Sequence, residues 1–190
     1  GGELAVSTYT LGVTGSVTNS GTISSSGTIN CAAFTSTGTY TSGTANAINA
    51  GGSVQISGTF NGTPANNTLT MSGSTTLNAS VGIGSLVVSN TVSLANALVL
   101  AGSMTISGGA LDVTGSNYQI SVAGSWTNSV GTAGFVEQNG TVVFTGTGTI
   151  TTAETFYNLT KSTGGTTTLG AAVTVTAAAT VSAGTLATGD

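Results

Sequence analysis

Residues 92–113 read VSLANALVLAGSMTISGGALDV, and this stretch decides which fold the chain can adopt. Aliphatic side chains recur in pairs two positions apart, and the pairs start 6, 6 and 7 residues after one another: Val92/Leu94, Leu98/Leu100, Met104/Ile106 and Leu111/Val113. Side chains at i and i+2 share one face of a strand. Gly, Ser, Asn and Ala, which tolerate corners, separate the pairs. The pattern therefore predicts very short strands joined by evenly spaced corners.

The same rhythm appears near the start of the chain, where GSVTNS, GTISSS and GTINCA follow one another over residues 15–32. Three such steps would close a triangular coil of about 19 residues, and 190 residues would make roughly nine or ten coils. In such a parallel β-solenoid each strand bonds to its equivalents about 4.8 Å above and below, which gives a rod about 45 Å long. Inward aliphatic side chains would form one continuous core.

An antiparallel sandwich fits the pattern less well, because it needs longer strands and hairpin turns. We therefore predict an all-β fold, a parallel β-solenoid that forms one domain over residues 1–190. The preference of parallel crossovers predicts a right-handed β-helix. A left-handed triangular solenoid remains the alternative, since a six-residue rhythm suits it too.

Longer self-similarity overlies this rhythm. STYTLGVTGSVTNS at residues 7–20 matches SNYQISVAGSWTNS at residues 116–129 at an offset of 109, with apolar and polar positions in register. A second match, at an offset of 75, pairs Leu94 with Leu169, Leu98 with Val173 and Leu111 with Leu186. These matches predict internal repeat units at residues 2–108 and 109–183, with a third beginning at residue 184.

Composition supports the all-β prediction and excludes several classes of function. Only 3% of the residues are charged, 30 are Gly and one is Pro, while helix-forming Lys, Arg, Glu and Gln are almost absent. A hydrophobic content of 38% argues against disorder. With Lys161 as the only basic residue, we predict no nucleic-acid partner. No apolar run is long enough for a membrane span, and no signal peptide is visible at the first residues.

The last third of the chain resembles a known class of repeats. It contains GSWTN at residues 124–128, GTVVF at 140–144, FYNLT at 156–160 and LGAAVTV at 169–175. This series is similar to repeats of very large bacterial surface-exposed and secreted proteins, closely over roughly the last 70 residues and partly over the first 100. The resemblance implies a β-solenoid of adhesin-like or filamentous cell-surface proteins, and it carries no catalytic residues over.

The residues that could carry chemistry are few. The chain has no His, which excludes triads and the usual zinc sites. Glu137 and Glu154 lie 17 residues apart, so they could stack as neighbours and imitate a glycosidase pair, with Trp126, Phe135 and Tyr157 as the only aromatic candidates for a sugar platform. We prefer the interpretation that the acids, Glu3, Asp112, Glu137, Glu154 and Asp190, are solvated corner residues. We predict that the protein is not an enzyme and has no catalytic, cofactor-binding or metal-binding residues.

Five other patterns have a structural and a functional interpretation. Cys31 follows an inward Ile29 by two positions, so we predict a buried thiol rather than an intermolecular disulfide. Lys161 could form an isopeptide bond with an Asn, and residues 108–112 partly match a calcium-binding repeat. Asn-x-Ser/Thr sequons occur at Asn61, Asn66, Asn78, Asn139 and Asn158. Thr-x-Thr pairs could order water as an antifreeze face does, but their spacing shows no single column at the coil period. They begin at Thr68, Thr145, Thr147, Thr166 and Thr174.

The absence of chemistry predicts a structural role. An uncapped solenoid end is an open sheet edge, and no charge cluster or amphipathic helix covers either end of this sequence. We therefore expect an extracellular or cell-surface protein that assembles with itself, as a subunit or segment of a rod or filament formed by head-to-tail stacking. The alternative is a stalk or binding region of an adhesin that contacts glycans or another cell through aromatics near Trp126 and Tyr157.

Overall fold

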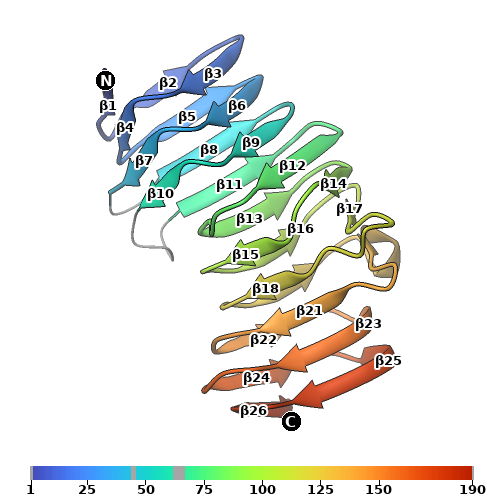
Figure 1. Cartoon of the computed structure of the whole chain (residues 1–190). Coiled ribbons are helices and arrows are strands. Elements are labelled where there is room, and N and C mark those ends of the chain that lie inside the picture. Colours follow the sequence, from blue (N-terminus) through green and yellow to red (C-terminus); the bar gives the residue numbers. More distant parts are fainter. Residues whose placement is uncertain (1, 44–45, 62–66, 190) are drawn as a thin grey trace.

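The computed structural model of the chain describes residues 2–43, 46–61 and 67–189. Within these ranges the protein is an all-β parallel solenoid of about nine turns, with equivalent positions about 19 residues apart. Figure 1 shows the strands stacked along one axis, with the two termini at opposite ends of the stack. Each pairing between strands is parallel, which confirms the predicted fold class and rules out the antiparallel sandwich.

The strands form four sheets, which we label A to D. Sheet A consists of β1 (Glu3–Val6), β4 (Thr22–Ser25), β7 (Thr39–Ser42) and β10 (Thr59–Asn61). Sheet B consists of β2 (Thr10–Gly12), β5 (Thr28–Cys31), β8 (Asn46–Ala50), β11 (Asn67–Met71), β13 (Ser85–Val88), β16 (Met104–Ile106), β19 (Trp126–Asn128), β22 (Gly148–Ile150), β24 (Thr166–Leu169) and β26 (Thr185–Thr188).

Sheet C consists of β3 (Ser16–Asn19), β6 (Ala33–Ser36), β9 (Val54–Ile56), β12 (Thr75–Ala79), β14 (Val92–Leu94), β17 (Leu111–Asp112) and β20 (Phe135–Val136). Sheet D consists of β15 (Leu98–Leu100), β18 (Ile120–Val122), β21 (Thr141–Phe144), β23 (Glu154–Lys161) and β25 (Val173–Val181). A short 3₁₀ helix, η2 (Thr132–Gly134), lies in the connection between β19 and β20.

The chain visits the sheets in a fixed order, which makes each turn of the coil. In the first half it runs from A to B to C, and in the second half D takes the place of A. A single bridge between Ile83 and Leu100 extends sheet D by one position toward the first half. Sheet C ends at β20, and the turns that follow alternate between the long strands of sheet D and the strands of sheet B.

The core consists of columns of inward side chains. The longest column runs along sheet B, where register places these residues above one another: Leu11, Ile29, Ile48, Leu69, Leu86, Met104, Trp126, Ile150 and Leu169. The pairs that suggested the fold behave as predicted, since Leu98, Leu100, Met104 and Ile106 are each at most 1% exposed. Because a parallel register puts like residues in contact, every coil buries the apolar face of its neighbours.

Gly-Ser steps form the corner before the middle strands of sheet B. The Ser85 Oγ accepts a hydrogen bond from the Ser103 backbone N–H (2.9 Å), and the Ser103 Oγ accepts one from Ser125 (3.0 Å). The preceding Gly124 has no room for a side chain, because a Cβ there would lie 2.5 Å from the Ser103 Oγ. The corner therefore requires Gly followed by Ser, which explains why this dipeptide recurs.

The long-range sequence matches do not always relate strands of the same sheet. Val17 lies in sheet C, whereas its match at an offset of 109, Trp126, lies in sheet B. Leu98 and Val173 share sheet D, but Leu111 and Leu186 lie in C and B. The repeat-unit boundaries at residues 109 and 184 therefore stay a prediction, while the shorter coil period is seen directly.

Stacked columns should make inward positions far more sensitive to truncation than outward ones. We expect Leu86→Ala to lower the free energy of unfolding by about 2–5 kcal/mol, because the column loses contacts on both sides. Its neighbour Val87 faces outward, so Val87→Ala should change the stability by about 0.5 kcal/mol or less. Urea denaturation of the two variants measures both effects, and equal losses would contradict the inward column.

Candidate functional site

The only basic side chain of the protein is buried in the core. Lys161 is 1% exposed and occupies an inward column of sheet D, directly between Phe144 and Val181 in register. Its Nζ donates hydrogen bonds to the backbone carbonyl oxygens of Gly146 (2.9 Å) and Gly164 (3.2 Å). These oxygens lie at the corners of two successive coils, so the ammonium group links one coil to the next. The alternative raised for Lys161, an isopeptide bond to an Asn, is not the favoured interpretation, and intact mass would test it through the loss of ammonia.

A buried carboxylate lies at the other end of the same strand. Glu154 is 2% exposed, and its Oε2 accepts hydrogen bonds from Trp126 Nε1 (2.8 Å) and Asn128 Nδ2 (2.9 Å). Its Oε1 accepts a third from the Thr155 backbone N–H (3.0 Å). The prediction that Glu154 is a solvated corner residue is therefore wrong. The alternation of β23 turns this side chain inward, where three donors replace the water it loses.

Asn128 connects this carboxylate to the loop that follows β19. Its Nδ2 also donates to the Gly131 carbonyl oxygen (2.7 Å), and its Oδ1 accepts from the Val130 N–H (3.1 Å). The loop packs tightly, since a Cβ on Gly134 would lie 2.3 Å from the Asn128 Oδ1. We call Trp126, Asn128 and Glu154 the Glu154 cluster. It accounts for the Trp and Asn of the GSWTN motif, both of which point inward.

Two opposing effects act on the ionisation of Glu154. Burial raises the pKa of this carboxyl group above its ordinary value of 4.5, and the nearby charge of Glu137 raises it further. The hydrogen bonds from Asn128, Trp126 and Thr155 lower the pKa, but burial is the larger effect and the pKa is raised. Glu137 thus interacts electrostatically with Glu154, but the strand pairings do not stack the two acids, since Glu154 lies opposite Val173.

The arrangement around this acid pair does not resemble a sugar-binding surface. Trp126 and Phe135 are 0% and 2% exposed, and their rings pack edge to face in the core with centroids 4.9 Å apart. The prediction that Trp126 offers an exposed aromatic surface is therefore wrong. An indole in a hydrophobic column gains more from burial than a Trp on a polar face would. Tyr157, on the outer side of β23, is half-buried.

Protonation of Glu154 should make stability depend on pH. Because its pKa is raised on folding, the native state binds more protons than the unfolded state, and the free energy of unfolding falls as pH rises above about 4.5. We expect the melting temperature to decline as pH rises above about 4.5, with the decline removed in Glu154→Gln and kept in Glu3→Gln, which changes an exposed acid. Thermal melts followed by Trp126 fluorescence measure this. The same slope in Glu154→Gln as in the parent would contradict it.

Lys161 should be replaceable by an apolar side chain of similar length. Removing a buried charge also removes its desolvation cost, so Lys161→Met should leave the melting temperature unchanged or raise it. Lys161→Ala should lower it, because the column between Phe144 and Val181 loses its packing. Differential scanning calorimetry compares the variants. A marked destabilisation of Lys161→Met would mean that the two carbonyl contacts outweigh the desolvation cost.

Most of the remaining sequence candidates have local roles or no special environment. Cys31 is buried, as predicted, and burial raises the pKa of its thiol. The Asp112 Oδ1 accepts a hydrogen bond from the Thr114 N–H (2.7 Å). It therefore shapes a turn at the end of residues 108–112, the stretch that partly matches a calcium-binding repeat. Among the residues described, no three His, Cys, Asp or Glu side chains gather as metal ligands. Likewise, no helix in the described ranges is long and apolar enough to cross a membrane.

The sequons differ in exposure. Asn139 is exposed, whereas Asn78 and Asn158 are half-buried. The Asn61 side chain and all of Asn66 lie outside the described residues, as does the acid Asp190.

A mixed column of Thr and Ser hydroxyl side chains follows the outer face of sheet B, whereas the Thr-x-Thr pairs by themselves form no single column, as expected. Thr68 pairs with Ser85 and Thr149 with Thr168, while hydrogen bonds connect the serines of the strands between them. The sequence does not reveal this column for two reasons: Ser replaces Thr in several coils, and the corners differ in length. Because Ser85, Ser103 and Ser125 each accept a backbone hydrogen bond from the next coil, these hydroxyls stabilise the stack.

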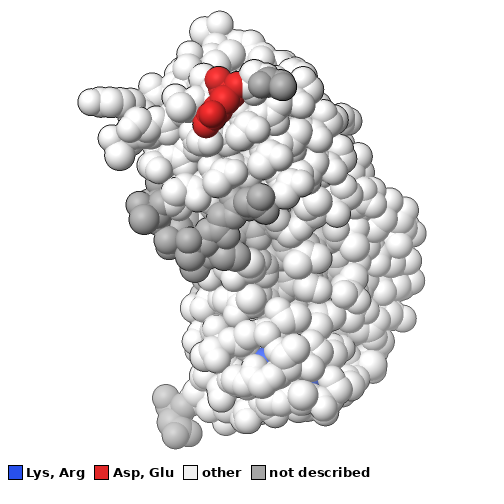
Figure 2. Space-filling view, turned by 60° about the vertical axis from the view of Figure 1, so that its left-hand side comes forward, with Lys and Arg blue, Asp and Glu red and all other residues white. Residues whose placement is uncertain are grey.

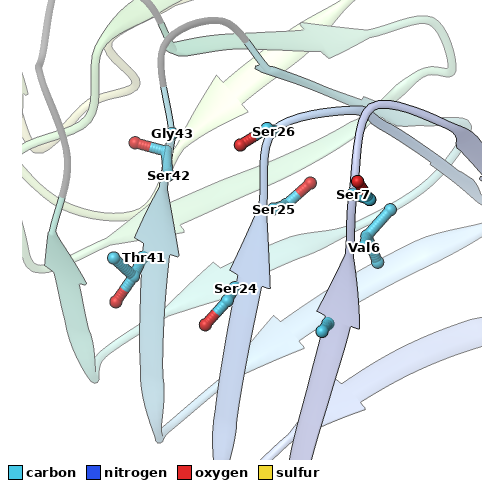
Figure 3. Close-up of a pocket in the computed structure, with 9 residues that line it drawn as sticks. Val6, Ser7, Ser24, Ser25, Ser26, Thr41, Ser42 and Gly43 are labelled. Atoms are coloured by element: carbon cyan, nitrogen blue, oxygen red, sulfur yellow. The ribbon is translucent and has the colours of Figure 1, made fainter.

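A shallow hollow of about 390 Å³ lies where β1, β4 and β7 end. Figure 3 shows Ser24, Ser25 and Ser26 on the middle strand of the three, with Val6 and Ser42 beside them. All of its lining side chains are small and uncharged. Hydroxyls of this kind can hydrogen-bond a neutral ligand, but without a neighbouring base they are not activated as nucleophiles.

The two ends of the solenoid expose apolar side chains. Of the five large hydrophobic residues that are exposed within the described ranges, Leu4 and Tyr9 lie on the first coil and Val181 on the last, at 42%, 78% and 53% exposure. The strands at these ends, β1 and β2 at one and β25 and β26 at the other, each pair on one side only. Both ends therefore offer free backbone groups beside uncovered apolar side chains.

Comparison with family models, with curated proteins and with solved structures found no match.

Proposed function

We propose that this chain is a structural protein, a subunit or segment of a rod or filament that grows by head-to-tail stacking of β-solenoid coils. The observation that carries the proposal is the unbroken parallel stacking of inward side chains through the described coils, from Leu11 to Leu169 in sheet B. The columns of the core continue to both terminal coils, where Leu4 and Val181 stay partly uncovered. Another coil placed on either end would bury these side chains and complete the backbone ladder.

The near absence of charge supports an assembly of this kind. Figure 2 shows a face with a single red patch and only specks of blue, and the sequence has a net charge of −4 over 190 residues. Like charges on stacked ends would repel one another, and here the terminal strands β1, β2, β25 and β26 contain one charged residue, Glu3. Proteins that keep their sheet edges apart usually place Lys, Pro or bulges on them; the described terminal strands contain neither Lys nor Pro, although β25 has one register irregularity, between Val175 and Ala178.

An extracellular or cell-surface location belongs to the same proposal. It is supported by the resemblance of residues 122–189 to repeats of large bacterial surface-exposed proteins. A surface that is hydrated through Thr, Ser and Asn side chains, with almost no Lys or Glu, is compatible with a rod outside the cell. Binding another copy of itself is the only partnership that this proposal needs.

A second candidate function is glycan contact by an adhesin stalk. It is favoured by the hydroxyl-lined hollow at the end of β1, because Tyr9, the most exposed aromatic in the described ranges, lies in the connection that follows this strand. Sugars bind to aromatic faces flanked by hydroxyl groups that can hydrogen-bond. A glycan array separates this candidate from the first, since a pure filament segment would give no signal on it.

A charge placed inside the open end should prevent stacking. Val181 points inward at the exposed end of its column, so Val181→Lys would place an ammonium group between two coils that must pack together. We expect the parent protein to form fibres in negative-stain electron microscopy and Val181→Lys to stay monomeric.

The matched control is Thr180→Lys, which adds the same charge on the outer face of the same strand. It should form fibres as the parent does. A parent protein that remains monomeric at high concentration, or fibres formed equally well by Val181→Lys, would overturn the proposal.

A further inference from the structure

We propose that one water molecule is bound inside the solenoid, where it forms a hydrogen bond with the side-chain amide oxygen of Asn67. The site lies between the coils that contain β8, β11 and β13, well within the described stack. It is independent of the proposed function, because it requires no contact between copies of the chain.

Asn67 occupies an inward column of sheet B at the layer where side chains give way to glycine. It lies opposite Asn46 in the pairing of β11 with β8. On its other side, the pairing of Thr68 with Ser85 brings Gly84 opposite Asn67. Because Gly84 has no side chain, the column leaves space beside the Asn67 amide.

A small cavity lies at this position, lined by Asn46, Asn67 and Gly84 and, on its apolar side, by Phe60 and Ile83 among others. Its volume is about 10 Å³. That is close to the volume of one water-sized sphere, so the cavity has room for a single water molecule and not for an organic ligand. None of its lining residues is charged, and a calcium or magnesium ion would need about six oxygen ligands. The cavity therefore fits a small neutral ligand.

The cavity exists because the third face of the solenoid changes sheets at this level. β10 is the last strand of sheet A, and its Phe60 ring stacks on Tyr40 with centroids 4.6 Å apart. The next coil contributes Ile83, which bridges to Leu100 and so belongs to sheet D. Within the described ranges no strand pairing joins Phe60 to Ile83. The regular contact between layers is therefore interrupted here.

The polar groups at the cavity have hydrogen-bonding capacity that the protein does not use. Asn67 is 4% exposed, and its Oδ1 has no hydrogen-bond partner among the residues that the structure describes. The Asn46 Nδ2 donates one N–H to the Tyr40 hydroxyl oxygen, and an amide carries a second N–H. A water between the two amides accepts this second N–H and donates one O–H to the Asn67 Oδ1. Because ordering one water costs less than leaving a buried amide oxygen unpaired, the water stabilises the contact between these coils.

Nuclear Overhauser effects between water and methyl protons test the site, because three isoleucines line the cavity: Ile48, Ile56 and Ile83. In a perdeuterated chain labelled at the isoleucine δ1 methyl groups, the bound water should give a cross-peak to at least one of them. Ile106 and Ile120 are fully buried but do not line the cavity, so their methyl groups should give none. The absence of a cross-peak at all three cavity methyl groups would overturn the inference.

Three variants make the result specific to Asn67. Asn67→Leu replaces the amide by an apolar side chain of similar size and should abolish the cavity cross-peaks. The matched control, Asn49→Leu, makes the same change on the outward side of β8 and should keep them. Cross-peaks that persist in Asn67→Leu would refute the water. Tyr40→Phe removes the hydroxyl whose exchanging proton could imitate a bound water, and it should also keep the cross-peaks. Their loss in Tyr40→Phe would overturn the inference, even if Asn67→Leu failed to fold.

Discussion

Parallel stacking of similar inward side chains in successive coils is the constraint on which the rest of this structure depends. Each strand has only three to five residues in most coils, too few to be stable alone, and it gains its backbone partners from the coils above and below. That arrangement works only if the inward side chain of one coil fits the inward side chain of the next. The column from Leu11 to Leu169 meets this condition with aliphatic residues in nearly every layer, interrupted by one indole.

Buried polar side chains occur in both halves of the described chain, and the two that are ionisable and charged, Glu154 and Lys161, lie in the second half. Glu154 takes three donors, and Lys161 takes two carbonyl oxygens from neighbouring coils. Neither group can move to a different layer without losing these partners, which an aliphatic residue could do at little cost. Buried polar groups thus define the register in the part of the solenoid where the pattern of three short strands per coil gives way to long strands.

The same architecture underlies the proposed stacking function. The faces carry small hydroxyl and amide side chains that bond along the stack, as the serines of the Gly-Ser corners do. The buried acid and base, Glu154 and Lys161, face the core. On the first and last described coils the apolar side chains of Leu4, Tyr9 and Val181 are exposed. For a fold built by adding layers, an open end is the surface at which another layer can bind.

The short inward pairs by themselves determined the fold, since the period of two within strands and the spacing of six to seven between them suit only stacked coils. They also determined the burial of Cys31 and the inward direction of Leu98, Leu100, Met104 and Ile106. Only the tertiary structure decided that the side chains of Glu154, Trp126 and Lys161 are buried, because a corner and a strand interior look alike in a sequence so poor in charge. The hydroxyl column of sheet B likewise needed the structure, since coils of unequal length hide vertical alignment from any fixed repeat. The short-range periodicity can be seen directly in the sequence, whereas the contacts between coils depend on the number of residues in each corner.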